Sequence, residues 1–214
     1  IGNSFVPRYT RLVDTVESKD NINKAYNLIS TSKVRNEMIV DDVITCITRK
    51  QTPVILTRFK EHAKFLYDAL KGKADHVFLL YGDNSDKENT EIRGRLKQVP
   101  GSESLVLVAT GQKIGEGFDF PRLDVLMLAA PVSFEGRLEQ YVGRLNRDYV
   151  GKEAVYVYDY IDSHVRYFDK MYAKRLRTYR KTGFSIWTQE LQPKQIINAI
   201  FDSVNYTEKF EQDI

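Results

Sequence analysis

The chain contains one cysteine, Cys46, and three histidines among its 214 residues. A single thiol cannot form an internal disulfide or a cysteine-based zinc site, and it fits a reducing compartment such as the cytoplasm. The histidines His62, His76 and His164 lie far apart and lack the spacing of metal ligands. We therefore predict no metal site and expect ordinary core or surface histidines.

Long apolar runs are also missing. No stretch approaches the roughly 18 residues of a membrane-spanning helix, and the N-terminus lacks the charged and apolar blocks of a signal peptide. We therefore expect no membrane partner. The first residue, Ile1, is not methionine, which suggests a piece of a longer protein. The net charge is only +3, so a surface that binds nucleic acid must be a local patch.

Short apolar runs alternate with helical patterns through most of the chain. Because the runs are apolar throughout, they are typical of strands covered on both faces. The pattern predicts an α/β fold of three layers, α/β/α, with a mostly parallel sheet. We expect strands at 53–57, 76–80, 105–109, 125–129 and 155–158, and helices at 35–50, 61–70 and 87–99.

The pattern divides the chain into three parts. Residues 1–50 form a lead-in segment, irregular apart from a short helix near 22–30, followed by the first long helix. Residues 51–160 form the α/β domain, and residues 161–214 a basic helical extension. Lys170, Lys174, Arg177 and Lys181 follow helical spacing in this extension. They fit either a face that follows a phosphate backbone, with nearby tyrosines stacking or packing, or an ordinary solvated face.

The most informative segment is 140–147, Gln-Tyr-Val-Gly-Arg-Leu-Asn-Arg. Arg144 and Arg147 lie three residues apart, one helical turn, so a helix would aim both guanidinium groups at one phosphate. The pattern resembles motif VI of superfamily 2 helicases, whose arginines reach across a cleft to ATP held by another domain. The resemblance implies that Arg144 and Arg147 are the catalytic arginines and that Gln140 contacts the nucleotide.

A glycine-rich segment, 109–121, follows the expected third strand. It matches neither the phosphate loop Gly-x-x-x-x-Gly-Lys-Ser/Thr nor the dinucleotide pattern Gly-x-Gly-x-x-Gly. It resembles helicase motif V. The resemblance implies that Thr110, Gly111 and Lys113 face phosphates of a nucleic-acid strand, and that Gly117 and Asp119 face the ATP cleft.

A weaker likeness concerns the end of the first expected strand. Thr57 and Arg58 resemble the part of motif IV that contacts nucleic acid. Because ligands of parallel sheets bind beyond the carboxyl ends of the strands, Thr57 and Thr110 are both expected at the functional rim.

Together these likenesses cover residues 35–182 and resemble the second RecA-like domain of a superfamily 2 helicase, of the DEAD/DEAH-like or restriction-enzyme motor branch. The resemblance implies an ATP-dependent helicase whose ATP and Mg²⁺ are held mainly by an N-terminal RecA-like domain of the same polypeptide. It also implies a nucleic-acid partner, DNA in preference but with RNA as the alternative, and no activity of this chain alone. The alternatives are a non-catalytic RecA-like module that binds nucleic acid and an unrelated doubly wound enzyme.

Overall fold

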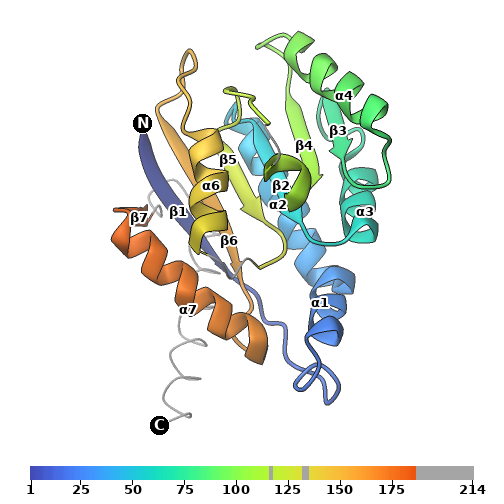
Figure 1. Cartoon of the computed structure of the whole chain (residues 1–214), viewed down its shortest axis with the longest axis vertical. Helices are drawn as coiled ribbons and strands as arrows, with labels where there is room; N and C mark the ends of the chain where they lie inside the picture. The colour runs from blue at the N-terminus through green and yellow to red at the C-terminus, as the bar shows by residue number, and fades with distance from the viewer. Residues whose placement is uncertain (116–117, 132–134, 187–214) are drawn as a thin grey trace.

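A single sheet of seven parallel strands forms the centre of the molecule (Figure 1). The computed structural model describes residues 1–115, 118–131 and 135–186. The strands are β1 Gly2–Tyr9, β2 Pro53–Thr57, β3 His76–Leu80, β4 Leu105–Thr110, β5 Val125–Leu128, β6 Ala154–Ile161 and β7 Ser185–Ile186. Their order across the sheet is β3-β4-β2-β5-β6-β1-β7. The predicted α/β fold with a mostly parallel sheet is confirmed.

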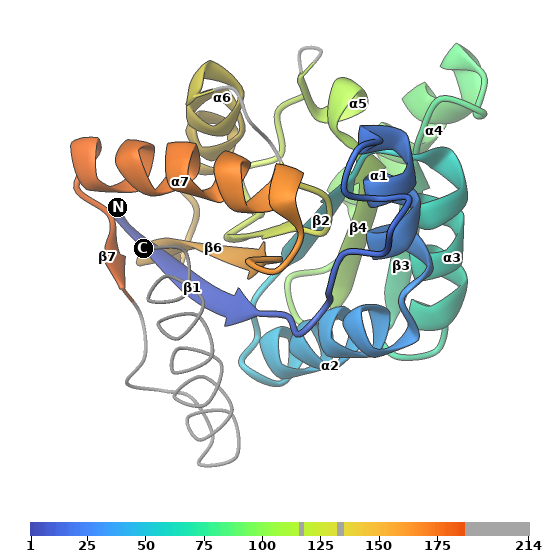
Figure 2. The same cartoon turned by 90° about the horizontal axis from the view of Figure 1, so that it is seen from below.

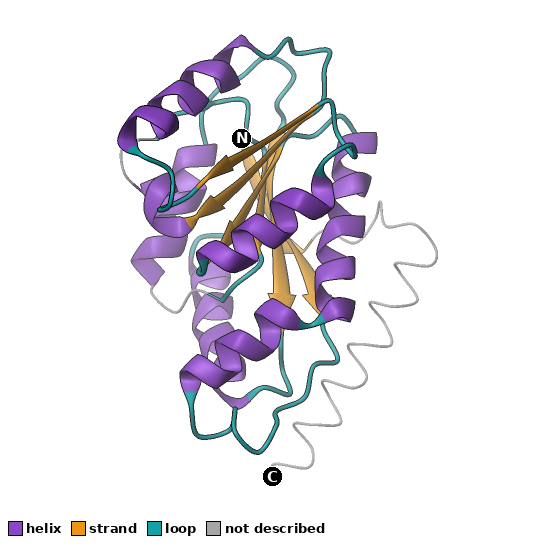
Figure 3. Cartoon of the chain, turned by 90° about the vertical axis from the view of Figure 1, so that its right-hand side faces the viewer, coloured by secondary structure: helices purple, strands orange, loops and turns teal. Residues whose placement is uncertain are grey.

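Helices cover both faces of this sheet (Figures 2 and 3). They are α1 Ile22–Thr31, α2 Lys33–Thr48, α3 Lys60–Leu70, α4 Asp86–Gln98, α5 Gly111–Gly115, α6 Glu135–Leu145 and α7 Arg166–Lys181. One core contains side chains of α4, α5, α6 and α7, and a second core on the opposite face contains those of α2 and α3. A third, smaller cluster joins α1 to the start of α7.

Burial on both faces explains the continuous apolar strands. In β2, Val54 and Leu56 pack into the core under α4 to α7, whereas Ile55 packs under α2 and α3. None of the three is more than 4% exposed. Removing a buried side chain of this size from water contributes roughly 1.5–3 kcal/mol, so a polar residue at any of these positions would destabilise the sheet.

The predicted helices and strands of residues 22–158 lie within a few residues of their expected positions. Local signals set several ends. The Ser85 hydroxyl accepts from the Glu88 amide while the Glu88 carboxylate accepts from the Ser85 amide, a reciprocal cap at the start of α4. The Asn21 side chain likewise accepts from two amides at the start of α1.

The expectation of an irregular segment before residue 22 is wrong for Gly2–Tyr9. These residues form β1, which pairs with β6 along its whole length and, within the described part of the chain, with β7 at Ser4 and Phe5. Pro7 suggested a loop, because proline cannot donate to a strand ladder. It nevertheless lies within this strand, in register with Asp159 of β6. The sheet therefore takes strands from both sides of the boundary predicted at residue 50.

None of the helices in the described ranges is long and apolar enough to cross a membrane. Two tyrosines of the basic extension pack inside the protein, and Tyr167 is half-buried. Tyr172 and Tyr179 of α7 are buried, and Tyr179 stacks on Phe5 of β1 with ring centroids 4.5 Å apart. The predicted amphipathic part of residues 188–214 lies outside the described residues.

Candidate functional site

The predicted site residues fall into two groups at opposite ends of the strands. Thr57 and Thr110 are register partners at the carboxyl ends of β2 and β4, as the rim prediction requires. Asp119 and Arg147 lie instead beside the amino ends of β5 and β6, since they belong to the segments that lead into those strands. Helix α5 begins directly after Thr110, and Asp119 follows the end of this helix by four residues in the sequence.

At the rim, the Thr57 side chain points into the protein. Its exposed fraction is 4%, and its hydroxyl lies 2.6 Å from Nδ1 of His62. The other ring nitrogen, Nε2, lies 2.8 Å from the Asn36 side-chain oxygen and therefore donates to it. The Thr57 hydroxyl then donates to Nδ1. The Thr57 hydroxyl is thus engaged inside the protein, and the predicted contact of Thr57 with nucleic acid stays a prediction.

His62 is held neutral by this arrangement. Burial, together with the nearby positive charge of Arg35, lowers the pKa of the imidazole to about 3. The hydrogen bonds to Thr57 and Asn36 need one donor and one acceptor, which only the neutral ring offers. His62 is therefore a core histidine, as expected from its isolated position in the sequence.

Arg58 is the exposed group at this end of β2. Its guanidinium lies over the Tyr26 ring of α1, 4.4 Å from the ring centroid. Stacking on an aromatic face restricts the arginine side chain. The N–H groups at the edge of the guanidinium can still donate to an anion. Helix α1 thus orients the predicted phosphate contact.

The segments that resemble motifs V and VI touch each other. Gly111, the first residue of α5, lies so close to α6 that a β-carbon there would come within 2.6 Å of the Tyr141 hydroxyl oxygen. Tyr141 is 5% exposed. Only glycine lets the two helices approach this closely without a shift. Lys113, two residues on, is partly buried, and its carbonyl accepts a long bond of 3.5 Å from Arg93 of α4.

At the opposite end, Arg147 pairs with Asp119. Nε of Arg147 lies 3.9 Å from Oδ1 of Asp119, and both side chains are more than half exposed. The expectation that one helix carries both arginines is wrong: α6 ends at Leu145, so Arg144 lies in its last turn and Arg147 in the loop that follows. The guanidinium of Arg147 is consequently positioned by the loop and by Asp119.

Lys152 holds this loop in place. Its ammonium group donates to the carbonyls of Leu145, Arg147 (3.0 Å) and Pro121 (2.8 Å). It thus joins the end of α6, the backbone of Arg147 and the segment that carries Asp119. Partial burial lowers the pKa of the Lys152 ammonium, against the nearby carboxylates of Asp124 and Asp148.

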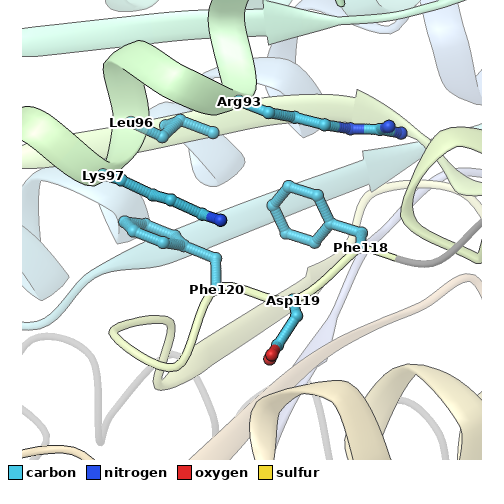
Figure 4. A pocket seen from close by; sticks show the side chains of 6 residues that line it. All are labelled: Arg93, Leu96, Lys97, Phe118, Asp119 and Phe120. Carbon is cyan, nitrogen blue, oxygen red and sulfur yellow. The ribbon is translucent and has the colours of Figure 1, made fainter. Parts of the chain in front are cut away.

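A small cavity of about 100 Å³ adjoins Asp119 (Figure 4). Arg93, Leu96 and Lys97 of α4 line one side of it. The rings of Phe118 and Phe120 line the other, and the Asp119 carboxylate points away from both rings. The two phenylalanines anchor the chain on either side of Asp119 and leave its carboxylate at the surface.

The remaining predicted residues are placed as follows. Gln140 is exposed on α6, and Arg144 is partly buried. Gly117 lies outside the described residues. Within the described ranges, no group of three or more His, Cys, Asp or Glu side chains could hold a metal ion. The donors at the Arg147 edge are therefore cationic and suit an anion.

Sequence reasoning missed four residues of the site. Tyr141 stood inside the quoted motif, but only the close approach of Gly111 reveals its contact. Tyr26 and His62 act across elements, beneath Arg58 and beside Thr57. Lys152 binds three carbonyls, a role that no side-chain pattern signals. A glycine directly after a strand was the one local hint, because it marks a possible close approach.

Comparison with solved structures gives the same fold. The chain superimposes on T4 UvsW with a TM-score of 0.67 and 22% identity, covering 86% of this chain and 40% of UvsW. The C-terminal domain of the DEAD-box protein Dbp5 matches with a TM-score of 0.53 and 12% identity, over 94% of this chain and 96% of that domain. These neighbours contain C-terminal domains of superfamily 2 helicases, so the predicted RecA-like fold is confirmed.

Sequence relatives of the chain include viral proteins. Transcript termination protein A18 of Yaba-like disease virus is 29% identical over 120 residues, 55% of this chain and 24% of the relative. The helicase-named protein 161L of Invertebrate iridescent virus 6 is 30% identical over 162 residues, 72% of this chain and 35% of the relative. The chain thus spans about a quarter to a third of these curated relatives. No protein-family model matches it.

Proposed function

We propose that this chain is the second motor domain of an ATP-dependent superfamily 2 helicase or translocase. The observation that carries the proposal is the meeting of the two motif-like segments: Gly111 against Tyr141, and Asp119 beside Arg147. An unrelated glycine-rich loop and a solvated helix would not be expected to make both of these contacts. The helicase-like fold of the structural neighbours and the helicase name of one relative support the same proposal.

On the nucleotide side, Arg147 and Arg144 would donate to oxygens of the γ-phosphate, with Gln140 and Asp119 beside them. Two arginines at this edge suit a γ-phosphate that another domain holds from its opposite side. The sequence has no phosphate loop of its own, so an N-terminal RecA-like domain would hold ATP and Mg²⁺. An arginine finger supplied in this way typically accelerates phosphoryl transfer by about 10³ to 10⁵.

On the rim side, Arg58, Thr110, Gly111 and Lys113 would contact the phosphate backbone. Contacts of this kind position a strand without reading its sequence, so little base preference is expected. The Gly111–Tyr141 contact would join the two sides mechanically. A shift of α6 on closure over ATP would reach α5 and with it the grip on the strand, which is the coupling that translocation needs.

DNA is the proposed nucleic acid, and the cytoplasm the proposed compartment. The viral relatives named transcript termination proteins support a nucleic-acid substrate, although their name does not distinguish a template from a transcript. Division of the chain into a lead-in, a motor domain and a basic extension belongs to the same proposal.

ATP hydrolysis distinguishes this function from its rivals. We expect the 214-residue chain alone to show no ATPase activity, and the full-length protein to hydrolyse ATP faster when DNA is added. Turnover by the isolated chain would contradict an incomplete motor. A full-length protein that binds DNA but never hydrolyses ATP would identify the chain as a non-catalytic binding module.

A further inference from the structure

Helix α7 carries a concentration of positive charge that the proposed motor does not use. Seven of its 16 residues are lysine or arginine and one is acidic, a net charge of +6 in a chain whose total is +3. The rest of the chain therefore carries −3. A patch of this sign on a nearly neutral protein is the local electrostatic footprint expected of a surface for a polyanion.

The cations face outward together. The exposed residues of α7 are Arg166, Lys170, Ala173, Lys174, Arg177, Arg180 and Lys181, with no carboxylate among them. The positions 170, 174, 177 and 181 recur at helical spacing and extend over about 16 Å of helix. A strand of nucleic acid could place several successive phosphates along this length.

A buried anchor fixes the rotation of the helix. Arg175 forms two hydrogen bonds of 2.8 Å with the two carboxylate oxygens of Asp159 in β6. The Tyr179 hydroxyl donates to the same carboxylate at 2.7 Å. Both side chains are at most 2% exposed. Because this anchor holds one side of α7 against the sheet, the opposite side with its cations is held toward solvent.

Arg166, at the start of α7, lies 3.8 Å from the Asp20 carboxylate, whereas the other outward cations lack the partners that other surface lysines have. Lys33, Lys64 and Lys71 each pair with a carboxylate on their own helix or next to it. Among the described residues, no ion pair involves Lys170, Lys174, Arg177, Arg180 or Lys181. Like charges three or four residues apart destabilise a helix by a few tenths of a kcal/mol per pair. A bound polyanion would remove that repulsion.

The basic face begins next to the rim. Tyr26, which lies under Arg58, packs against Phe168 of α7 with ring centroids 4.9 Å apart. Val165 and Phe168 share the small cluster with α1 and Phe59. The first turn of α7 therefore adjoins the exposed Arg58, and in Figure 2 the helix continues from there along the face that also carries α6.

From this continuity we propose that the outward face of α7 binds the phosphate backbone of a nucleic acid as a continuation of the rim. This surface extends the nucleic-acid track of the proposed function. It rests on that function in one respect, namely that a nucleic acid binds at the rim. Its binding would involve no ATP. Tyr172 and Tyr179 are buried and cannot stack on bases, so the contacts argued for this face come from its lysines and arginines.

Charge neutralisation on α7 tests the proposal. We would measure binding of a fluorescent single-stranded oligothymidylate to the full chain by anisotropy over a series of salt concentrations. The test variant is Lys174→Gln with Arg177→Gln. The matched control is Lys50→Gln with Lys73→Gln, two exposed lysines near the amino ends of β2 and β3 with the same change in net charge.

The test variant is expected to bind about tenfold more weakly, and the slope of log affinity against log salt is expected to fall by about 1.4, or 0.7 for each lost phosphate contact. The control should keep the wild-type slope. Equal losses in both variants, or no loss in either, would overturn the proposal. So would equally tight binding of poly-glutamate, since the surface would then suit any acidic polymer.

The variant Arg58→Gln separates this proposal from the proposed function. If Arg58→Gln weakens binding and the α7 variant does not, the rim stands and the α7 surface is wrong. If the α7 variant weakens binding while the full-length protein never hydrolyses ATP, the surface stands and the motor is wrong.

Discussion

Gly111 of α5 packs directly against the Tyr141 side chain of α6. A β-carbon at residue 111 would lie only 2.6 Å from the Tyr141 hydroxyl oxygen. This relationship joins the two ends of the proposed site, because α5 begins at the rim and α6 leads to Arg147. A shift of either helix must be accommodated by the other. The contact between Gly111 and Tyr141 can be tested by adding a β-carbon to the first residue or removing the hydroxyl oxygen of the second.

Gly111→Ala is expected to destabilise the protein by about 1–3 kcal/mol, the usual effect of overpacking a filled site. Tyr141→Phe removes the hydroxyl oxygen, and the next ring atom lies 3.4 Å from the added carbon, an ordinary contact. The double variant should therefore be more stable than the sum of the single changes predicts. Urea unfolding of all four proteins measures this coupling. Additive effects would show that the junction can relax freely.

The buried His62 predicts a specific dependence of stability on pH. Its pKa is about 3 in the folded protein against about 6.5 in the unfolded chain, so the unfolded state binds more protons between these values. Stability is therefore present above about pH 6.5 and is lost as the pH falls toward 3, by at most about 1.4 kcal/mol per pH unit.

His62→Gln isolates this effect. The wild type should lose more stability than the variant on acidification below about pH 6.5, as measured by urea midpoints. The comparison is necessary because Asp124 acts in the opposite direction. Burial raises the pKa of its carboxyl group to about 6, so its contribution is present at low pH and lost as the pH rises through 6. Parallel curves for wild type and variant would contradict the buried, neutral imidazole.

Lys152→Met is expected to loosen the loop that carries Arg147. The change removes donors from three carbonyl groups and leaves them to water. Because the ammonium is only partly buried, we expect a loss of about 1–3 kcal/mol rather than the full value of three charge-assisted bonds. Hydrogen exchange should accelerate at residues 146–151 and remain unchanged in α2. The exposed Lys50→Met serves as control, and matching exchange in both variants would remove Lys152 from its positioning role.

The sequence predicted those features that depend on short-range patterns. Continuous apolar runs located β2 to β6, and helical patterns located α2, α3 and α4. The strand β1 was missed because its partner β6 lies about 150 residues away in the sequence, and pairing over such a separation leaves no local signal. Arg147 was assigned to a helix because periodicity continues past Leu145, whereas the chain is turned there by contacts with Lys152.

The same distinction between local pattern and long-range contact applies to the site. Thr110 and Asp119 were assigned from the resemblance to motif V, and their roles stay predictions. The contacts that place them could not be found in this way, because Tyr141, Tyr26 and Lys152 come from other elements and act through distances that only the folded chain defines. Thr57 ends β2 at the predicted rim, but no pattern in the sequence indicates that its hydroxyl bonds to His62.

The last prediction concerns Arg147 itself. In the full-length protein, Arg147→Ala should reduce ATP turnover by about 10³ or more and leave ATP binding largely unchanged. Arg147→Lys should fail as well, because a point charge does not reproduce the planar fork. Asp119→Asn should alter stability by less than about 1 kcal/mol, since the pair is exposed, yet it should slow turnover if Asp119 orients the guanidinium.

Turnover and nucleotide affinity, measured separately by a phosphate-release assay and by binding of a fluorescent ATP analogue, distinguish these cases. Arg95→Ala provides the control, as this exposed arginine of α4 lies over the Phe78 ring and outside the proposed site. Loss of ATP binding in Arg147→Ala would mean that the residue holds the nucleotide in its ground state. Unchanged turnover would assign the arginine finger to another residue, and Arg144, one turn earlier on α6, would be the next to substitute.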